Sequence, residues 1–259
     1  MDLDIRGRRA LIMGSSQGLG LASARALACE GVDVILTGRS ATRLEQARQS
    51  MQAAGTAVDI HAVDFSDPTQ VATLVERIPA LGIDIVITNC GGPPAGDISA
   101  VDAQTWRAQF ETMVNVPIQI AQAALTHMRQ QAWGRIINIA SSSVVQLIPQ
   151  LGLSSALRMS VIGWAKALSL EVAADGVTVN SVIPGRIHTR RVDQIDLATA
   201  NRRGCTPHDV AAASQKAIPM QRYGRADEFA DAVAFLASGR ASYITGSALR
   251  VDGGLIQAI

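Results

Sequence analysis

Cysteine is scarce in this 259-residue chain, which carries only Cys29, Cys90 and Cys205. Their odd number, their wide separation and the lack of ligand-like spacing argue against a disulfide framework and against a metal site. We therefore expect three reduced thiols, buried as small apolar side chains, and no bound metal.

An excess of charge of one sign is also lacking. Lys and Arg number 23 against 22 Asp and Glu, a formal net charge of +1, and no block of like charges occurs. This balance argues against a nucleic acid or a membrane surface as a partner. No apolar run approaches the roughly 20 residues of a membrane span, and the charged N-terminus precedes a strand too short to be a signal sequence. The sequence predicts a cytoplasmic protein.

Apolar residues, by contrast, make up 48% of the chain and occur in short runs that alternate with helical patterns. The expected strands cover 10–13, 32–37, 58–63, 83–88, 136–140, 177–183 and 247–251. The expected helices cover 21–30, 42–54, 68–78, 102–131 with a kink at Pro117, 155–174 and 227–237. Strict alternation predicts a doubly wound α/β fold, in which helices cover both faces of a parallel sheet. We expect one domain, 1–259, with the polar segment 186–216 as a mobile lid.

Three glycines, Gly14, Gly18 and Gly20, separate the first expected strand from the first expected helix. The N-terminus of a helix presents unpaired N–H groups and partial positive charge, and glycines allow a pyrophosphate to approach them. This turn favours a dinucleotide site. An ordinary strand-to-helix turn uses glycine too, and the spacing differs from G-x-G-x-x-G, so the turn alone leaves both interpretations open.

Other polar or glycine-containing segments also follow directly after expected strands. They are Gly38-Arg39-Ser40, Asp64-Phe65, Asn89-Cys90-Gly91-Gly92, Ser141-Ser142-Ser143 and Pro184-Gly185. Because ligands of such sheets bind beyond the carboxyl ends of the strands, these segments are expected to form one site with the glycine turn.

Taken together, these motifs resemble the short-chain dehydrogenase/reductase family, and among its members the 3-oxoacyl-carrier-protein reductases most closely. The resemblance runs from Gly7 to Gly254 and includes the glycine turn, although Met13 stands where the family usually has Thr. The other matching segments are Asn89-Cys90-Gly91, Asn115, 137–141, 179–185, 243–246 and 251–254. It implies a seven-stranded Rossmann sheet, NAD(P) binding and a homodimer or homotetramer. The cofactor-binding residues it implies are Gly14, Ser16, Gly18, Leu19, Gly20, Arg39, Ser40, Asp64, Phe65, Asn89, Gly91, Pro184, Gly185, Ile187 and Thr189.

Arg39 bears on the choice of cofactor. An acidic residue after the second strand hydrogen-bonds the ribose hydroxyls of NAD and would repel a 2′-phosphate. This sequence has Thr37-Gly38-Arg39 there, and the arginine can form paired hydrogen bonds to a phosphate. NADP(H) is therefore favoured over NAD(H), the alternative being a solvated arginine that opens the next helix.

The catalytic positions depart from the family pattern. Asn115 and Ser141 match the family's Asn and Ser, but Ser154 and Arg158 occupy the positions of its Tyr and Lys. The matching segments 160–163 and 165–171 downstream support this register. The only tyrosines are Tyr223 and Tyr243, far along the chain, and they are not expected to substitute.

This departure matters because reduction of a ketone needs a proton for the developing alkoxide, which the family's Tyr supplies. A serine hydroxyl reaches roughly 4 Å less far than a phenol. Arg158 stays protonated, so it can stabilise an oxyanion or bind a carboxylate but cannot relay a proton. We expect Ser141, Ser154 and Arg158 to hold the substrate oxygen while water or the substrate gives the proton. The structural alternative is that Ser154 caps the helix and Arg158 lies on its surface.

The expected lid is basic, which suggests an anionic substrate such as a carboxylate or a carrier-linked acyl group, although a solvated loop is the commoner meaning of such charge. Its charged residues are Arg186, Arg190, Arg191, Arg202, Arg203 and Lys216 against Asp193, Asp196 and Asp209. His188 is expected to be an exposed loop histidine rather than a proton donor.

Three functions fit these residues. The first is an NADPH-dependent carbonyl reductase or alcohol dehydrogenase with altered proton delivery. The second is a cofactor-binding sensor or inactive subunit, favoured by the loss of Tyr and Lys. The third, a dehalogenase-like activity, fits least because relatives of that kind keep the Tyr and lose the glycine turn.

Overall fold

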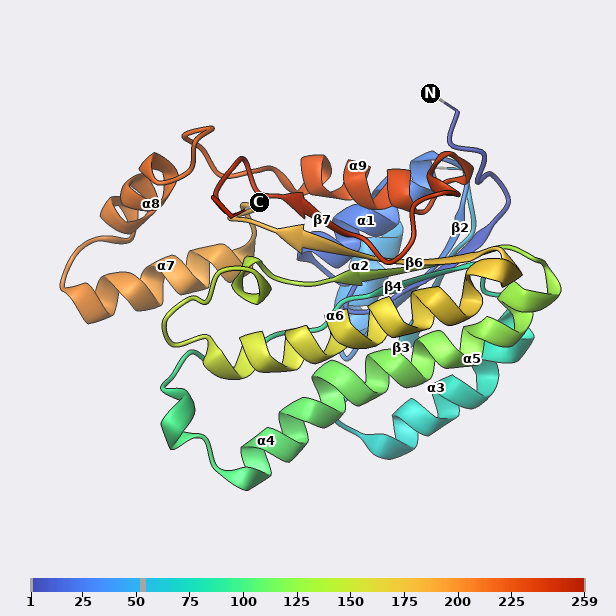
Figure 1. The fold of residues 1–259 in the computed structure, drawn as a ribbon, viewed down its shortest axis with the longest axis horizontal. Helices are drawn as coiled ribbons and strands as arrows, with labels where there is room; N and C mark the ends of the chain where they lie inside the picture. Colours follow the sequence, from blue (N-terminus) through green and yellow to red (C-terminus); the bar gives the residue numbers. More distant parts are fainter. Residues whose placement is uncertain (1, 52–54, 259) are drawn as a thin grey trace.

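The computed structural model describes residues 2–51 and 55–258 and is organised around a seven-stranded parallel sheet of order β3-β2-β1-β4-β5-β6-β7 (Figure 1). The strands are β1 Arg9–Ile12, β2 Asp33–Gly38, β3 Val58–Ala62, β4 Ile85–Thr88, β5 Gly134–Ile139, β6 Val177–Pro184 and β7 Ala248–Val251. The interior strands β4, β5 and β6 are almost fully buried on both faces, as expected for a sheet covered on both sides. The doubly wound α/β prediction is confirmed.

Helices cover both faces of this sheet. Their bounds are α1 Gly18–Cys29, α2 Ala41–Gln49, α3 Pro68–Leu81, α4 Ala103–Phe110, α5 Val116–Gln130, α6 Gly152–Val172, α7 Arg190–Arg203, α8 Pro207–Lys216 and α9 Ala226–Leu236. Figure 1 shows α3, α5 and α6 on one face and α1 and α9 on the other, and each set packs on its own cluster of buried apolar side chains.

Two predicted elements differ from the structure in instructive ways. The predicted helix 102–131 is interrupted at Glu111–Asn115, where one wider π turn separates α4 from α5 and Pro117 falls in the first turn of α5. Pro117 has no N–H to donate to the carbonyl one turn earlier, that of Met113, so it interrupts the helical hydrogen bonds where the π turn lies. The predicted helix 42–54 ends at Gln49, and 52–54 lie outside the described residues.

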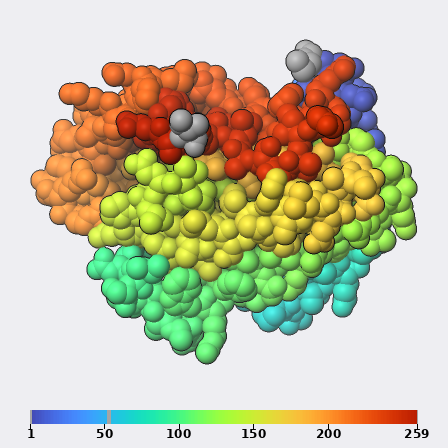
Figure 2. Space-filling model, viewed as in Figure 1, coloured from blue at the N-terminus to red at the C-terminus, as the bar shows by residue number. Residues whose placement is uncertain are grey.

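The predicted lid 186–216 carries two helices, α7 and α8, that the sequence analysis did not predict. The buried stripe of α7 is Val192, Asp196 and Ala200, so a charged residue interrupts the apolar period by which a helix is recognised. The start of α8 had a visible signal, because Thr206 and Asp209 form a reciprocal capping box. Figure 2 shows these helices, in orange, at one end of the molecule beside the yellow-green segment near residue 150.

The cysteines correct another expectation. Cys29 and Cys205 are exposed and Cys90 is half-buried, all three with free thiols. The prediction of buried thiols is wrong, because Cys29 ends α1 and Cys205 follows the last turn of α7, where the chain meets solvent.

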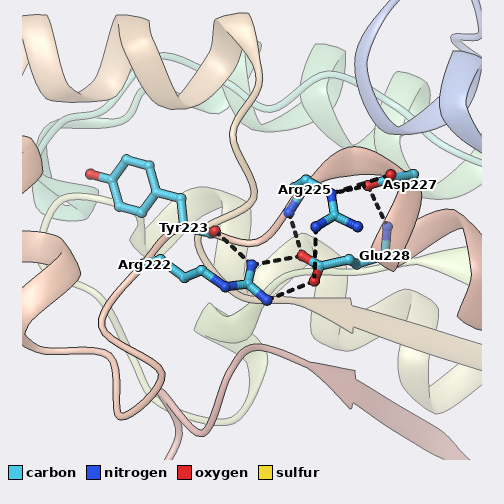
Figure 3. Close-up of polar contacts among 5 residues, drawn as sticks. All are labelled: Arg222, Tyr223, Arg225, Asp227 and Glu228. Carbon is cyan, nitrogen blue, oxygen red and sulfur yellow. Dashed lines mark hydrogen bonds and ion pairs between the residues drawn. The ribbon is translucent and has the colours of Figure 1, made fainter.

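A cluster of charged side chains fixes the start of α9 (Figure 3). Glu228 accepts hydrogen bonds from the Arg222 guanidinium, 2.6 and 2.8 Å long, and from the backbone N–H of Arg225. The Arg222 contact, and then the Arg225 N–H, lower the pKa of Glu228 to about 2. The adjoining Gly224 exchanges backbone hydrogen bonds with Arg186 and His188, so the cluster anchors the segment that follows β6.

Candidate active site

The segments singled out in the sequence meet at one edge of the sheet. All seven strands are parallel, so the residues that follow them share the carboxyl edge. Strands β1 and β4 are neighbours although two strands and three helices separate them in sequence, and this is where the strand order reverses. Such a reversal opens the crevice in which α/β sheets bind ligands.

The glycine turn is closed tightly at this reversal by Asn89. Ile12 pairs with Ile87 across the two strands, which brings Gly14 opposite Asn89, and the Asn89 amide Nδ2 donates to the Gly14 carbonyl at 3.1 Å. A Cβ on Gly14 would lie 2.8 Å from the Asn89 carbonyl oxygen, and a Cβ on Gly20 would lie 2.6 Å from the Gly14 carbonyl oxygen. Two of the three glycines are thus required by close backbone approach.

The first turn of α1 then points its backbone donors at the crevice. The helix begins at Gly18, whose φ is +62°, and the side chain of the N-cap residue Gln17 makes no capping hydrogen bond within the described chain. The N–H groups of Gly18, Leu19 and Gly20 therefore remain for a ligand. This cradle fits the pyrophosphate of a dinucleotide.

A second anion-compatible region lies after β2. A Cβ on Gly38 would be 3.7 Å from the Ser16 hydroxyl oxygen, so the glycine turn and the end of β2 are adjacent. Arg39 is exposed there, and Ser40 caps α2 by accepting from the Arg43 N–H at 3.3 Å. Asp64 follows β3, and hydrogen bonds from Ser66, assisted by attraction to Arg39, lower the pKa of Asp64. Phe65 packs against the core beside them.

The segment after β6 borders the same crevice. Pro184 ends β6, and the Gly185 N–H donates to the Val251 carbonyl, while a Cβ on Gly185 would lie 2.6 Å from Asp252 Cα. Ile187 is buried in the core and Thr189 is the N-cap residue of α7. His188 is exposed and lies 3.4 Å from a carboxylate oxygen of Asp193, as expected for a loop histidine.

Ser141 follows β5 with its hydroxyl oriented by a neighbour. Its Oγ accepts from the Ser143 hydroxyl at 3.0 Å and from the Ser143 N–H at 3.2 Å, across a single 3₁₀ turn, Ser142–Val144. An oxygen that accepts two bonds still has its own proton to donate. Ser143 is fully buried. The sequence placed it in the expected site, but its hydrogen bonds to Ser141 were not predicted, because they depend on the tight turn.

Arg158 and Ser154 form the other half of the site. They lie one turn apart on α6, and Arg158 Nε donates to Ser154 Oγ at 3.3 Å. Arg158 Nη1 donates to the Ile139 carbonyl and Nη2 to the Cys90 carbonyl, both at 3.1 Å. The guanidinium thus joins the ends of β4 and β5. The capping alternative for Ser154 is wrong, because the N-cap residue is Leu151 and Ser154 lies inside the helix, 8% exposed.

The comparisons with known proteins agree with this geometry. A family model described as enoyl-(acyl carrier protein) reductase matches residues 14–256. The 3-oxoacyl-[acyl-carrier-protein] reductase FabG of Escherichia coli is 33% identical over 257 residues, 98% of this chain and 99% of the relative. The chain belongs to the short-chain dehydrogenase/reductase family of NAD(P)-dependent oxidoreductases.

Solved structures extend the comparison. An L-sorbose reductase of Gluconobacter frateurii, complexed with NADPH and L-sorbose, superposes with a TM-score of 0.94 at 30% identity, covering 100% of both chains. YwfH, an NADPH-dependent reductase involved in bacilysin biosynthesis, superposes with a TM-score of 0.91 at 29% identity, covering 97% of this chain and 99% of the other. Among the described residues, no helix is both long and apolar enough to cross a membrane.

Asn115, which was expected to correspond to the family's mid-helix Asn, lies in the π turn. Its Nδ2 donates to both carboxylate oxygens of Glu111, at 2.9 and 3.0 Å. None of its described hydrogen bonds reaches Ser141, Ser154 or Arg158. Glu111 was missed in the sequence, although its four-residue spacing from Asn115 on a helical segment was a usable signal.

Both tyrosines have other surroundings. The Tyr223 hydroxyl donates to the buried Asp196 carboxylate of α7 at 2.7 Å, and burial raises the pKa of this phenol. Figure 3 shows the Tyr223 ring directed away from the cluster at the start of α9. Tyr243 is fully exposed. Neither phenol is held by Ser141, Ser154 or Arg158 in the described contacts.

Proposed function

We propose that this chain is an NADP(H)-dependent oxidoreductase that interconverts a carbonyl and an alcohol, with Ser154 and Arg158 in place of the family's Tyr and Lys. The observation that supports this proposal is the position of Arg158. Its guanidinium bonds the carbonyls that end β4 and β5 and the Ser154 hydroxyl, at the edge of the sheet that carries the glycine turn.

Ser141, Ser154 and Arg158 have different roles in the proposed reaction. Bound NADPH would supply the hydride. Ser141, whose oxygen already accepts two hydrogen bonds, donates its proton in a hydrogen bond to the substrate oxygen. Ser154 and the fixed charge of Arg158 stabilise the negative charge that develops on that oxygen. Because the guanidinium of Arg158 does not release its proton, the proton that converts the alkoxide to the alcohol comes from water or from a group of the substrate.

The alternative is a cofactor-binding protein without turnover, acting as a sensor or an inactive subunit. The placement of the phenols favours it, because Tyr223 is bonded to Asp196 and Tyr243 is exposed. The retained Ser141 and the tight glycine turn favour the reductase, since turnover needs both a cofactor cradle and a donor for the substrate oxygen.

One experiment separates these two functions. NADPH oxidation is followed by absorbance with a panel of ketones, diketones, oxo acids and thioesters, and NADPH affinity is measured in parallel. For the reductase we expect turnover that falls roughly 10- to 100-fold in Ser154→Ala, the loss of one hydrogen bond to a developing charge. Tight NADPH binding with no turnover, unchanged by Ser154→Ala, supports the sensor. Absence of tight NADPH binding contradicts both.

Arg39 is proposed to bind the 2′-phosphate of NADP(H). It is exposed after β2, beside Ser16 and Ser40, which are placed to assist it. We expect Arg39→Ala to weaken NADPH binding roughly 10- to 100-fold, through the loss of a charge-assisted contact, and to leave NADH binding unchanged. Fluorescence titration of both nucleotides measures the difference.

Arg43→Ala is the matched control, because Arg43 is an exposed arginine four residues further on, in the first turn of α2, and its described contact with Ser40 is through its backbone N–H. Equal effects of the Arg39 and Arg43 changes would indicate general electrostatic attraction and contradict the assignment. A parallel loss of NADH affinity in Arg39→Ala would contradict it as well.

A further inference from the structure

Two arginines from different helices meet a serine at one point of the site. The point is the position that a Cβ on Gly92 would occupy, in the segment after β4. Arg191 Nη2 of α7 and Ser154 Oγ of α6 are each 3.6 Å from it, and Arg158 Nη2 is 4.0 Å away. Because Gly92 has no side chain, these three polar groups converge above its backbone with no side chain of Gly92 between them.

Neither guanidinium has a carboxylate partner among the described ion pairs. Arg158 donates to Ser154, Ile139 and Cys90, and Arg191 Nη2 donates to the Pro93 carbonyl at 3.2 Å, so all these acceptors are neutral. Like charges on converging side chains repel each other, so this arrangement favours an anionic ligand over a neutral one, and the exposed Arg191 is accessible to it.

The nearby acidic side chains have other partners. Asp196 bonds Arg186 and Tyr223, Asp193 lies beside His188, and Glu111 accepts from Asn115. The positive charge at Gly92 is therefore not neutralised by these groups, and a ligand that enters must supply the anion.

We propose that Arg191 and Arg158 bind a carboxylate of the substrate and that this enzyme acts on small oxo acids. The proposal rests on the proposed function, because it places the reacting carbonyl oxygen at Ser154 and Arg158. Because Arg191 Nη2 and Ser154 Oγ each lie 3.6 Å from one point, they are at most about 7 Å apart, and a carboxylate and a carbonyl separated by no more than one carbon can bridge them with a hydrogen bond to each. This spacing is that of a 2-oxo or a 3-oxo acid.

The reaction balances for such a substrate. The carbonyl carbon gains a hydride and its oxygen gains a proton from water, which yields a hydroxy acid as NADPH is oxidised to NADP⁺. The carboxylate stays ionised throughout, so Arg191 serves in binding and orientation. Arg191 is thus a specificity-determining residue. The sequence indicated an anionic substrate from the total charge of the lid, but it did not single out Arg191.

Binding of malonate tests the anion site without turnover. Malonate carries two carboxylates separated by one carbon, and dimethyl malonate is its uncharged counterpart. By calorimetry, in the presence of NADP⁺, we expect the protein to bind malonate and not the ester. Arg191→Leu should weaken malonate binding roughly 10- to 100-fold, whereas Arg190→Leu, which removes the adjacent exposed charge, should leave it unchanged.

Gly92→Ala tests the location of the site. Its methyl group would meet the three side chains at ordinary contact distances of 3.6–4.0 Å, and its backbone φ is not positive, so the fold should be unaffected. The methyl group would nevertheless project between the three groups proposed to bind the ligand, and malonate binding should fall at least about 10-fold. Unchanged malonate binding in Gly92→Ala, or equal losses in Arg190→Leu and Arg191→Leu, would overturn the proposal.

Kinetics with acetoacetate and methyl acetoacetate then separate this inference from the proposed function. If both hold, wild type prefers the acid, and Arg191→Leu raises KM for the acid roughly 10- to 100-fold with no change for the ester. Turnover of the acid and the ester with no Arg191-dependent difference in KM overturns the inference and is still consistent with the proposed reductase. Malonate binding that depends on Arg191, with no turnover of any substrate, supports the anion site and overturns the reductase.

Discussion

Replacement of Arg158 by methionine is expected to lower kcat/KM for a carbonyl substrate by about 100- to 1000-fold. Methionine keeps most of the apolar stem of arginine but removes the charge beside Ser154 and the two bonds to the Ile139 and Cys90 carbonyls. A preorganised donor next to a developing oxyanion contributes this much in acyl-transfer enzymes, and Arg158 has the same electrostatic task here. Steady-state NADPH oxidation measures the loss.

Lys166→Met is the matched control, since Lys166 is an exposed cation two turns further along α6 and its change removes the same charge from the same helix. We expect it to retain wild-type activity. The unfolding midpoint and the NADPH affinity of Arg158→Met are measured beside its activity. Loss of activity only in proportion to loss of folded protein would make Arg158 a structural residue and contradict the catalytic role.

Arg158→Lys distinguishes charge from geometry. A lysine restores the cation but cannot bond Ser154, Ile139 and Cys90 together, because an ammonium lacks the planar fork of a guanidinium. If kcat/KM of Arg158→Lys lies between those of Arg158→Met and the wild type, the part recovered is due to the charge alone. The part of kcat/KM still missing is then due to the orientation of Ser154.

The fold could be predicted because its signal is local and repeated. The strand β4 is an apolar run up to its last residue, Thr88, and a helix such as α3 has its own start signal in Pro68. The helix α7 could not be predicted in the same way, because its buried face includes Asp196, which is stabilised by Arg186 and Tyr223. Those partners come from distant parts of the chain that a local pattern does not contain.

The site was predictable to the same extent. Ser154 and Arg158 were expected to act on the same substrate oxygen, and their 3.3 Å contact places them together on α6, which begins three residues before the expected helix 155–174. The meeting of Arg191 with the segment after β4 was not predictable, because 98 residues separate Arg191 from Pro93, whose carbonyl it contacts. Their proximity arises only when the carboxyl ends of the strands gather at one edge of the sheet.

Replacement of Gly20 by alanine is expected to abolish measurable NADPH binding and to lower the free energy of unfolding by about 2–3 kcal/mol. The added Cβ would lie 2.6 Å from the Gly14 carbonyl oxygen and 2.9 Å from the Asn89 amide nitrogen, which are themselves hydrogen-bonded to each other. The nearest obstacle is backbone, so relief requires the glycine turn to move away from α1. That movement displaces the N–H groups expected to bind the pyrophosphate.

Gly163→Ala is the control for this last prediction, because it makes the same chemical change in α6, where the added Cβ has no atom within 4 Å. There alanine should raise the free energy of unfolding by about 0.5–1 kcal/mol through its better helix propensity, with NADPH binding unchanged. Urea unfolding and fluorescence titration of both variants measure the contrast. Wild-type NADPH affinity in Gly20→Ala would mean that the cofactor does not contact the glycine turn, and the cradle would then have only a structural role.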